Sequence, residues 1–172
     1  MTDAKSTLRD VRPVERGPRP VRVRRSLVAL LGLIVLAGAT GLFGVRTTTD
    51  TATAAGWTLS VTSARVARAG LDVPWQVTVR RDGGFPGPVT LAVTAAYFDI
   101  FESQGLDPEP ATETADGSLL YWTFDPPPGD ELTISFDAYV QPSSQLGASG
   151  EVAVLVDGGP VVGVPFRTWL VP

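Results

Sequence analysis

The chain has 172 residues, of which 44% are hydrophobic and 19% charged, with a net charge of −4 and neither cysteine nor histidine. Without these two residue types there is no disulfide framework, no zinc site built on thiolate or imidazole, no thiolate nucleophile and no imidazole base. The length allows about one domain of roughly 100 to 150 residues. Composition alone therefore excludes several classes of enzyme.

The charge is distributed unevenly. Residues 1–25 carry eight basic and three acidic side chains, whereas residues 46–172 carry six basic and fifteen acidic ones. The basic segment is interrupted by proline and has too few clustered apolar residues to form a core, so we expect a disordered tail. Its arginines are expected to lie near anionic lipid headgroups rather than to bind nucleic acid.

The segment 26–45, SLVALLGLIVLAGATGLFGV, contains no ionisable side chain. A helix of this length reaches about 30 Å, the thickness of the hydrocarbon core of a bilayer. The segment therefore predicts a single transmembrane helix in the cell membrane. The basic residues before it place the N-terminus in the cytoplasm and residues 46–172 outside.

A cleaved secretory signal is the alternative interpretation of this region. Ala52-Thr53-Ala54 has the small-x-small form of a cleavage site, and a basic segment precedes the apolar one. However, the apolar run is longer than a usual signal core, and the candidate site lies beyond Arg46 and a polar stretch. A retained signal-anchor is the interpretation that the pattern favours.

The remainder of the chain divides into a tether and a β domain. Residues 46–55 are polar, lack a hydrophobic period and predict a short tether, whereas residues 56–172 alternate apolar and polar side chains. Period-two alternation indicates strands with one buried face. Seven such runs, separated by Gly and Pro turns, predict an all-β, Ig-like antiparallel β-sandwich that follows the transmembrane helix. The runs are 57–61, 73–79, 89–93, 120–124, 132–140, 152–156 and 162–170.

The tryptophans follow this alternation in different ways. Trp75 and Trp122 lie in the apolar phase of their strands, which predicts core positions. Trp169 is out of phase with Phe166 and Leu170. We expect Trp169 to be exposed or to contact a partner.

Three stretches follow one another in an order that resembles a known family: LDVPWQVTVRRDGGFPGPVTLAVT, YWTFDPPPGDELTISFDAYVQP and GEVAVLVDGG. Together they resemble the bacterial conserved repeat domain of unknown function, the DUF11 type, found in surface proteins. The resemblance covers roughly residues 70–160 and implies an Ig-like β-sandwich. That family supplies no catalytic residues, so the resemblance implies no activity.

The segment 95–117, between the third and fourth runs, holds six carboxylates, three aromatic residues and no basic group. Loops of this length are more often functional or disordered than accidental. We predict that this loop, together with Trp169, binds a partner. The candidate residues are Tyr97, Phe98, Asp99, Phe101, Glu102, Asp107, Glu109 and Trp169.

Two other interpretations of this loop remain open. Its three aromatic residues have the spacing of one helical turn, which would cover an end of the sandwich. Alternatively, its carboxylates bind calcium or a sugar, although their spacing does not follow the common Asp-x-Asp-x-Asp-Gly calcium loop.

Several catalytic arrangements are excluded by the residues present. Serine hydrolysis lacks its histidine, and the sole lysine, Lys5, lies in the predicted cytoplasmic tail and cannot serve a Ser-Lys dyad outside the membrane. A sandwich of this size leaves little room for a substrate cleft between paired carboxylates. We therefore expect a protein without enzymatic activity, cofactor or metal, which presents an acidic domain to another membrane or envelope protein.

Overall fold

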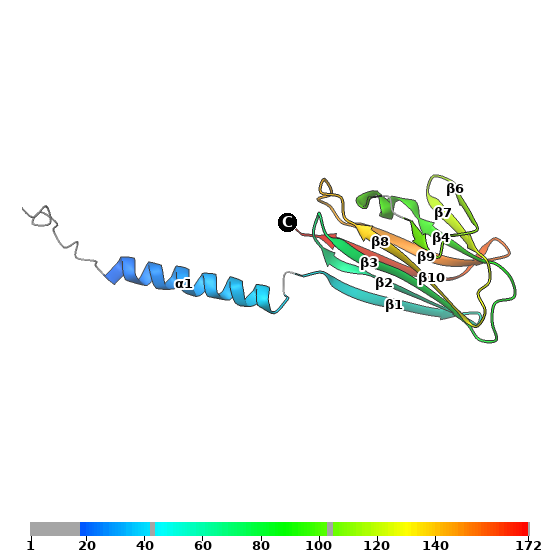
Figure 1. Ribbon diagram of the computed structural model, residues 1–172, viewed down its shortest axis with the longest axis horizontal. Helices are drawn as coiled ribbons and strands as arrows, with labels where there is room; N and C mark the ends of the chain where they lie inside the picture. Colours follow the sequence, from blue (N-terminus) through cyan, green and yellow to red (C-terminus); the bar gives the residue numbers. More distant parts are fainter. Residues whose placement is uncertain (1–17, 42–43, 103–104, 172) are drawn as a thin grey trace, which may run out of the picture. The chain divides into compact units, whose positions relative to one another are not determined.

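The structure is a computed structural model that describes residues 18–41, 44–102 and 105–171 (Figure 1). It divides into two compact units, one up to Gly44 and one from Val45 onward. Helix α1 (Pro18–Ala39) belongs to the first unit. The second unit contains ten strands and the 3₁₀ helix η1 (Ala95–Ile100).

Helix α1 begins earlier than the predicted transmembrane segment. Its first residue is Pro18, whose fixed φ suits the first position of a helix. Residues 18–25, which the sequence predicts as part of a disordered tail, are therefore helical. The remainder of that predicted tail, residues 1–17, lies outside the described residues.

The same helix ends at Ala39, before the predicted boundary at residue 45. Gly41 has a φ of +71°, a left-handed conformation that glycine adopts without steric cost and that commonly terminates a helix. The N–H of Gly41 bonds the carbonyl of Gly38 at 3.0 Å, closing the last turn. Among the described residues, no helix combines the length and the hydropathy needed to cross a membrane.

The second unit is mostly β, as the sequence predicts, and its strands form one continuous path that curls on itself. The order is β5-β8-β3-β2-β10-β9-β4-β7-β6, with β1 paired to β2 off this path. Neighbours in the path are antiparallel, except that the end of β10 runs parallel to β2. The strands are β1 (Arg46–Ala54), β2 (Trp57–Ala67), β3 (Asp72–Arg81), β4 (Val89–Thr94), β5 (Leu106–Asp107), β6 (Thr112–Ala115), β7 (Leu119–Phe124), β8 (Glu131–Tyr139), β9 (Ala148–Val156) and β10 (Gly159–Leu170).

All seven predicted strands are present, as β2, β3, β4, β7, β8, β9 and β10. The predicted tether at 46–55 is different: residues 46–54 form β1, which pairs with β2 along its whole length. Two further short strands, β5 and β6, lie inside the segment 95–117. β1 is mostly exposed, β6 is wholly exposed and β5 has only two residues, so none carries the apolar alternation that reveals a strand in a sequence.

The core lies between the two halves of the curled sheet. Trp75 from β3 meets Trp122 from β7 edge-on, with ring centroids 6.0 Å apart, and it meets Phe166 from β10 at 6.2 Å. Trp75 is 1% exposed and Trp122 is 3% exposed, which confirms the positions predicted from their phase. Aromatic pairs of this kind add to the stabilisation from burial by about 0.5–1.5 kcal/mol each.

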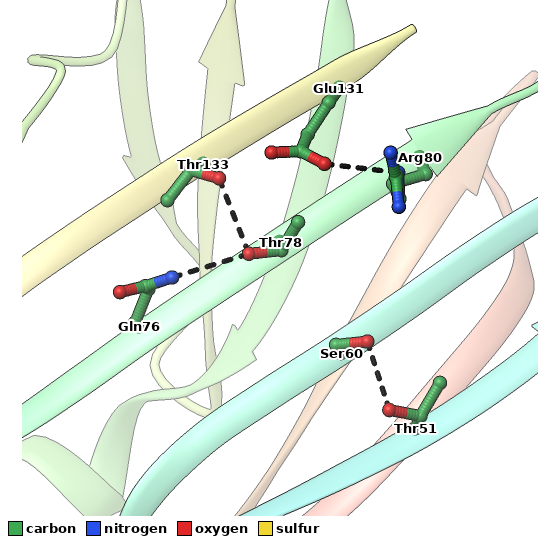
Figure 2. Close-up of polar contacts among 7 residues, drawn as sticks. All are labelled: Thr51, Ser60, Gln76, Thr78, Arg80, Glu131 and Thr133. Atoms are coloured by element: carbon green, nitrogen blue, oxygen red, sulfur yellow. Dashed lines mark hydrogen bonds and ion pairs between the residues drawn. The ribbon is translucent and has the colours of Figure 1, made fainter.

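On β1, β2, β3 and β8, the face that points away from the core carries hydroxyl and other polar side chains, and we call it the hydroxyl face. Figure 2 shows seven residues of this face: Thr51, Ser60, Gln76, Thr78, Arg80, Glu131 and Thr133. The hydroxyl oxygens of Thr78 and Thr133 are 3.3 Å apart, and Nε of Arg80 lies 3.0 Å from Oε2 of Glu131. A sheet with one apolar and one polar face is typical of antiparallel strands that meet solvent on one side.

The hairpin between β6 and β7 is held by one carboxylate. Asp116 accepts hydrogen bonds from the hydroxyl of Tyr121 at 2.7 Å and from the backbone N–H groups of Leu119 and Ser118 at 2.9 and 3.0 Å. These bonds favour the ionised form and hold the pKa of Asp116 well below its usual range. The turn therefore fixes the position of β6, which is a short and wholly exposed strand.

Candidate functional site

Helix η1 carries the aromatic residues of the segment 95–117 into one end of the core. Tyr97 is 1% exposed and Phe101, directly after η1, is 3% exposed, while Phe98 is partly buried. The ring of Phe98 lies 5.5 Å from that of Trp122 in β7 and 5.6 Å from that of Phe136 in β8. The structure thus shows the helical turn that was one of the interpretations of this segment.

A buried hydroxyl network fixes η1 against the sheet. The hydroxyl of Thr168 in β10 donates to the carbonyl of Ala64 in β2 at 2.6 Å and lies 2.8 Å from the hydroxyl of Tyr97. Because Thr168 has a single hydroxyl proton, Tyr97 is the donor in the second bond. Burial raises the pKa of Tyr97 to about 12, so this side chain is neutral at physiological pH.

A cavity of about 930 Å³ lies where the two ends of the strand path meet. Its walls come from β5 and β8 at one end of the path and from β6 and β7 at the other, with η1 and the residues after it between them. Its floor is formed by the largely buried aromatic residues Phe98, Phe101, Trp122 and Phe136. A volume of this size is in the range of small-ligand sites.

Four carboxylates line the same cavity: Asp99, Glu102, Glu109 and Glu113. Together with the four floor residues they define what we call the acidic aromatic pocket. Oε1 of Glu113 accepts a hydrogen bond from the indole N–H of Trp122 at 3.1 Å, which joins the rim to the floor. Among the residues that the structure describes, no basic side chain lines the pocket.

The shape of the pocket also depends on a residue from the loop after β8. The side-chain amide of Gln141 donates to the carbonyl of Phe101 at 2.7 Å, and the backbone N–H of Gln141 bonds the carbonyl of Ile100 at 2.9 Å. These two bonds hold the end of η1 against the loop.

The pocket has an apolar interior and a negative rim, a combination that favours ligands with a cationic group on an apolar stem.

Among the described residues, no three acidic side chains gather closely enough to form a metal-binding group. The carboxylates of the pocket are thus spread around its rim rather than converging on one point.

Five of the eight predicted candidates line the pocket: Phe98, Asp99, Phe101, Glu102 and Glu109. The other three do not: Tyr97 lies in the core, Asp107 is an exposed residue of β5, and Trp169 lies on β10. Sequence reasoning included Glu113 only among the carboxylates of the segment 95–117, and it did not place Trp122, Phe136 or Gln141 at this site. Trp122 and Phe136 carry only the signal of core residues, because alternation reports burial and not which buried side chain borders a cavity.

Trp169 is 50% exposed, as its phase predicts. The guanidinium carbon of Arg167 lies 3.5 Å from the centre of its ring, a distance typical of a cation–π contact. Both residues border a second, open groove of about 750 Å³ that also contains Arg65 and Glu151. Because charges of both signs line this groove, it favours no single class of ligand.

No protein-family model and no curated protein matches the chain. Two solved structures are weakly similar to it. One is an alkylpurine DNA glycosylase, AlkC, from Pseudomonas fluorescens bound to DNA with an abasic site analogue: TM-score 0.31, 15% identity, covering 61% of this chain and 28% of that one. The other is a β-glucosidase from Listeria innocua in complex with isofagomine: TM-score 0.30, 12% identity, covering 74% of this chain and 16% of that one.

The chain therefore spans less than a third of either structure, and similarity at this level supports no functional inference. The resemblance of residues 70–160 to the conserved repeat domain stays a prediction.

Proposed function

We propose that the protein is a single-pass, membrane-anchored binding protein without catalytic activity. In this proposal, an acidic Ig-like β-sandwich outside the membrane binds another membrane or envelope protein. The proposal has two parts, an anchor and a binding site, and a different set of observations supports each.

The anchor is the apolar segment 26–45. Helix α1 includes residues 26–39 of it, and large apolar side chains on this helix are well exposed, with Leu27, Val28, Leu31 and Leu33 between 60% and 63%. An apolar surface of this kind is typical of a region that contacts lipid or another protein. The arginines before residue 26 support a cytoplasmic N-terminus.

The acidic aromatic pocket is the observation that carries the binding function. It is large, it borders on aromatic side chains that are otherwise buried, and it is lined by four carboxylates and by no basic side chain of the described residues. Aromatic residues in a recess with a polar rim are characteristic of the centres of protein interfaces. A protein partner with a protruding basic group would bury the aromatic floor and neutralise the rim.

Calcium or sugar binding by the 95–117 loop is the second candidate function. The same four carboxylates support sugar binding, because their oxygens are hydrogen-bond acceptors for sugar hydroxyls, whereas calcium would need them to converge and no three acidic side chains of the described residues do so. The two functions differ in ligand size, since only a protein partner would yield a macromolecular adduct.

Site-specific photocrosslinking tests the proposal. The full chain carrying Glu109→p-benzoylphenylalanine is irradiated in native membranes, and the matched control carries the same residue at Thr133, an exposed position on the hydroxyl face. We expect a discrete protein adduct from position 109 and none from position 133. Adding Glu102→Gln and Glu113→Gln to the position-109 variant should weaken the adduct.

The absence of an adduct at position 109, or identical adducts from both positions, would contradict the proposal. An adduct at 109 that is unaffected by the two Glu→Gln substitutions would show that the partner binds outside the pocket.

A further inference from the structure

The charged side chains that line the acidic aromatic pocket, among the described residues, are all carboxylates. Asp99, Glu102 and Glu109 are exposed, and Glu113 bonds the indole of Trp122. Within the described part of the chain, the ion pair formed by Arg80 joins it to Glu131, on the hydroxyl face, and not to any carboxylate of the pocket. Among the residues that the structure describes, the rim therefore concentrates negative charge with no basic side chain lining it.

Two other arginines of the second unit contact aromatic rings outside the pocket. The guanidinium of Arg81 lies 5.0 Å from the centre of the Trp57 ring, and that of Arg167 lies 3.5 Å from the centre of the Trp169 ring. Neither residue lines the pocket. These two contacts also show that this domain already binds guanidinium groups on aromatic rings.

The arrangement discriminates between classes of ligand. An anion would be repelled by four carboxylates, and a neutral apolar group would leave them without a counter-charge. A bare metal ion would make no use of the aromatic floor. A lysine or arginine side chain satisfies both parts, since its apolar stem packs on rings while its charged end bonds carboxylates.

We infer that the pocket receives a lysine or arginine side chain of the partner protein. This inference rests on the proposed function and specifies the chemistry of its partner. The cavity exceeds one side chain in volume, so residues flanking the basic one also enter the recess. Phe98 then forms the aromatic contact, and the rim carboxylates bond the cationic end.

The indole N–H of Trp122 provides a reporter for this binding, because it bonds Glu113 at the junction of rim and floor. The full-length chain, labelled with ¹⁵N in detergent micelles, is titrated with three capped pentapeptides, Gly-Gly-Xaa-Gly-Gly, in which Xaa is lysine, arginine or Nε-acetyl-lysine. The indole signal of Trp57, which lies outside the pocket, serves as the internal reference.

We expect the lysine and arginine peptides to shift the Trp122 signal, with the acetyl-lysine peptide at least tenfold weaker because it lacks the charge. Glu102→Gln together with Glu109→Gln should weaken the cationic peptides about tenfold. The matched control, Glu131→Gln, removes a carboxylate from the hydroxyl face and should leave the affinity unchanged.

Equal binding of the acetyl-lysine peptide, a response confined to Trp57, or no response to either cationic peptide at millimolar concentration would overturn the inference. Crosslinking from position 109 combined with no peptide response overturns the cation assignment and leaves the proposed function standing. A peptide response that follows the expected pattern, without a crosslinked protein, supports the cation pocket and contradicts the proposed protein partner.

Discussion

At the scale of single residues, Thr168 joins three segments that are far apart in the sequence. Its hydroxyl bonds the carbonyl of Ala64 in β2 and accepts a bond from Tyr97 in η1, all inside the core. Gly150 in β9 permits this packing, because a Cβ there would lie 3.0 Å from Cβ of Tyr97. The position of η1, and with it the wall of the pocket, thus depends on two hydroxyl groups and a missing side chain.

Removing the hydroxyl of Thr168 should lower the free energy of unfolding more than removing the hydroxyl of Tyr97. Thr168→Val removes the bond to the Ala64 carbonyl and leaves the Tyr97 O–H without its acceptor in the core, and we expect a loss of about 3 kcal/mol in the free energy of unfolding. Tyr97→Phe removes one bond and leaves Thr168 bonded to Ala64, so we expect about 1 kcal/mol. Urea unfolding measures both, with exposed Thr133→Val as the control, expected within about 0.5 kcal/mol of the unsubstituted chain. A Thr168→Val loss no larger than that of the control would contradict this account.

The same pair has a pH signature. Burial raises the pKa of Tyr97 to about 12, above the usual value of 10.0, so the folded state holds this proton more tightly than the unfolded state does. The associated stabilisation is fully present below pH 10 and is lost as the pH rises from there toward about 12. Tyr97→Phe should therefore lose less stability over this interval than the unsubstituted chain.

At the scale of elements, β1 shows how a strand can form without an apolar pattern. Its exposed threonines face hydroxyl groups of β2, with oxygen separations of 2.8 Å for Thr49–Thr62 and 2.9 Å for Thr51–Ser60. Cross-strand pairs of this kind contribute roughly 0.2–1 kcal/mol each. The backbone ladder with β2 and these pairs hold β1 in place, whereas its sequence alone is indistinguishable from a polar tether.

Hydrogen exchange distinguishes a strand from a tether at this position. β1 pairs with β2 along one edge, so every second amide of residues 46–54 should be protected, and the others should exchange freely. We expect the slowest of these amides to exchange at least a hundredfold more slowly than in an unstructured peptide, measured by NMR in deuterated buffer. Uniformly fast exchange across 46–54, beside protected amides in β3, would mean that the segment is a tether after all.

At the scale of the whole molecule, the curled sheet brings its two ends together. β5 and β8 stand at one end of the strand path and β7 and β6 at the other, and the pocket lies between them. The rings of Phe136 and Trp122 therefore both contact the ring of Phe98. Phe136 and Trp122 are 14 positions apart along the chain, but many strands separate β8 from β7 in the path. The pocket exists because the sheet curls until its two ends lie close together.

The proposed membrane topology can be tested on the intact chain, because the sequence contains no cysteine. Single substitutions Thr7→Cys in the N-terminal segment and Thr133→Cys on the exposed hydroxyl face are treated with a membrane-impermeant maleimide in whole cells. We expect position 133 to react in intact cells and position 7 to react only after lysis. Labelling of position 7 in intact cells, or failure of position 133 to react before lysis, would contradict the proposed orientation.

The sequence by itself determined the division into an apolar helix-forming segment and an all-β unit, the seven strands with one buried face, and the core positions of Trp75 and Trp122. These features follow from local periodicity and charge, which act on neighbouring residues and can be read from the order of side chains. Only the tertiary structure decided that 46–54 pairs as a strand, that Tyr97 and Phe101 are buried, and that Glu113, Trp122 and Phe136 share a cavity with Glu109. Period-two alternation specifies which face of a strand is buried but not which strands become neighbours, and the pocket arises from that non-local pairing.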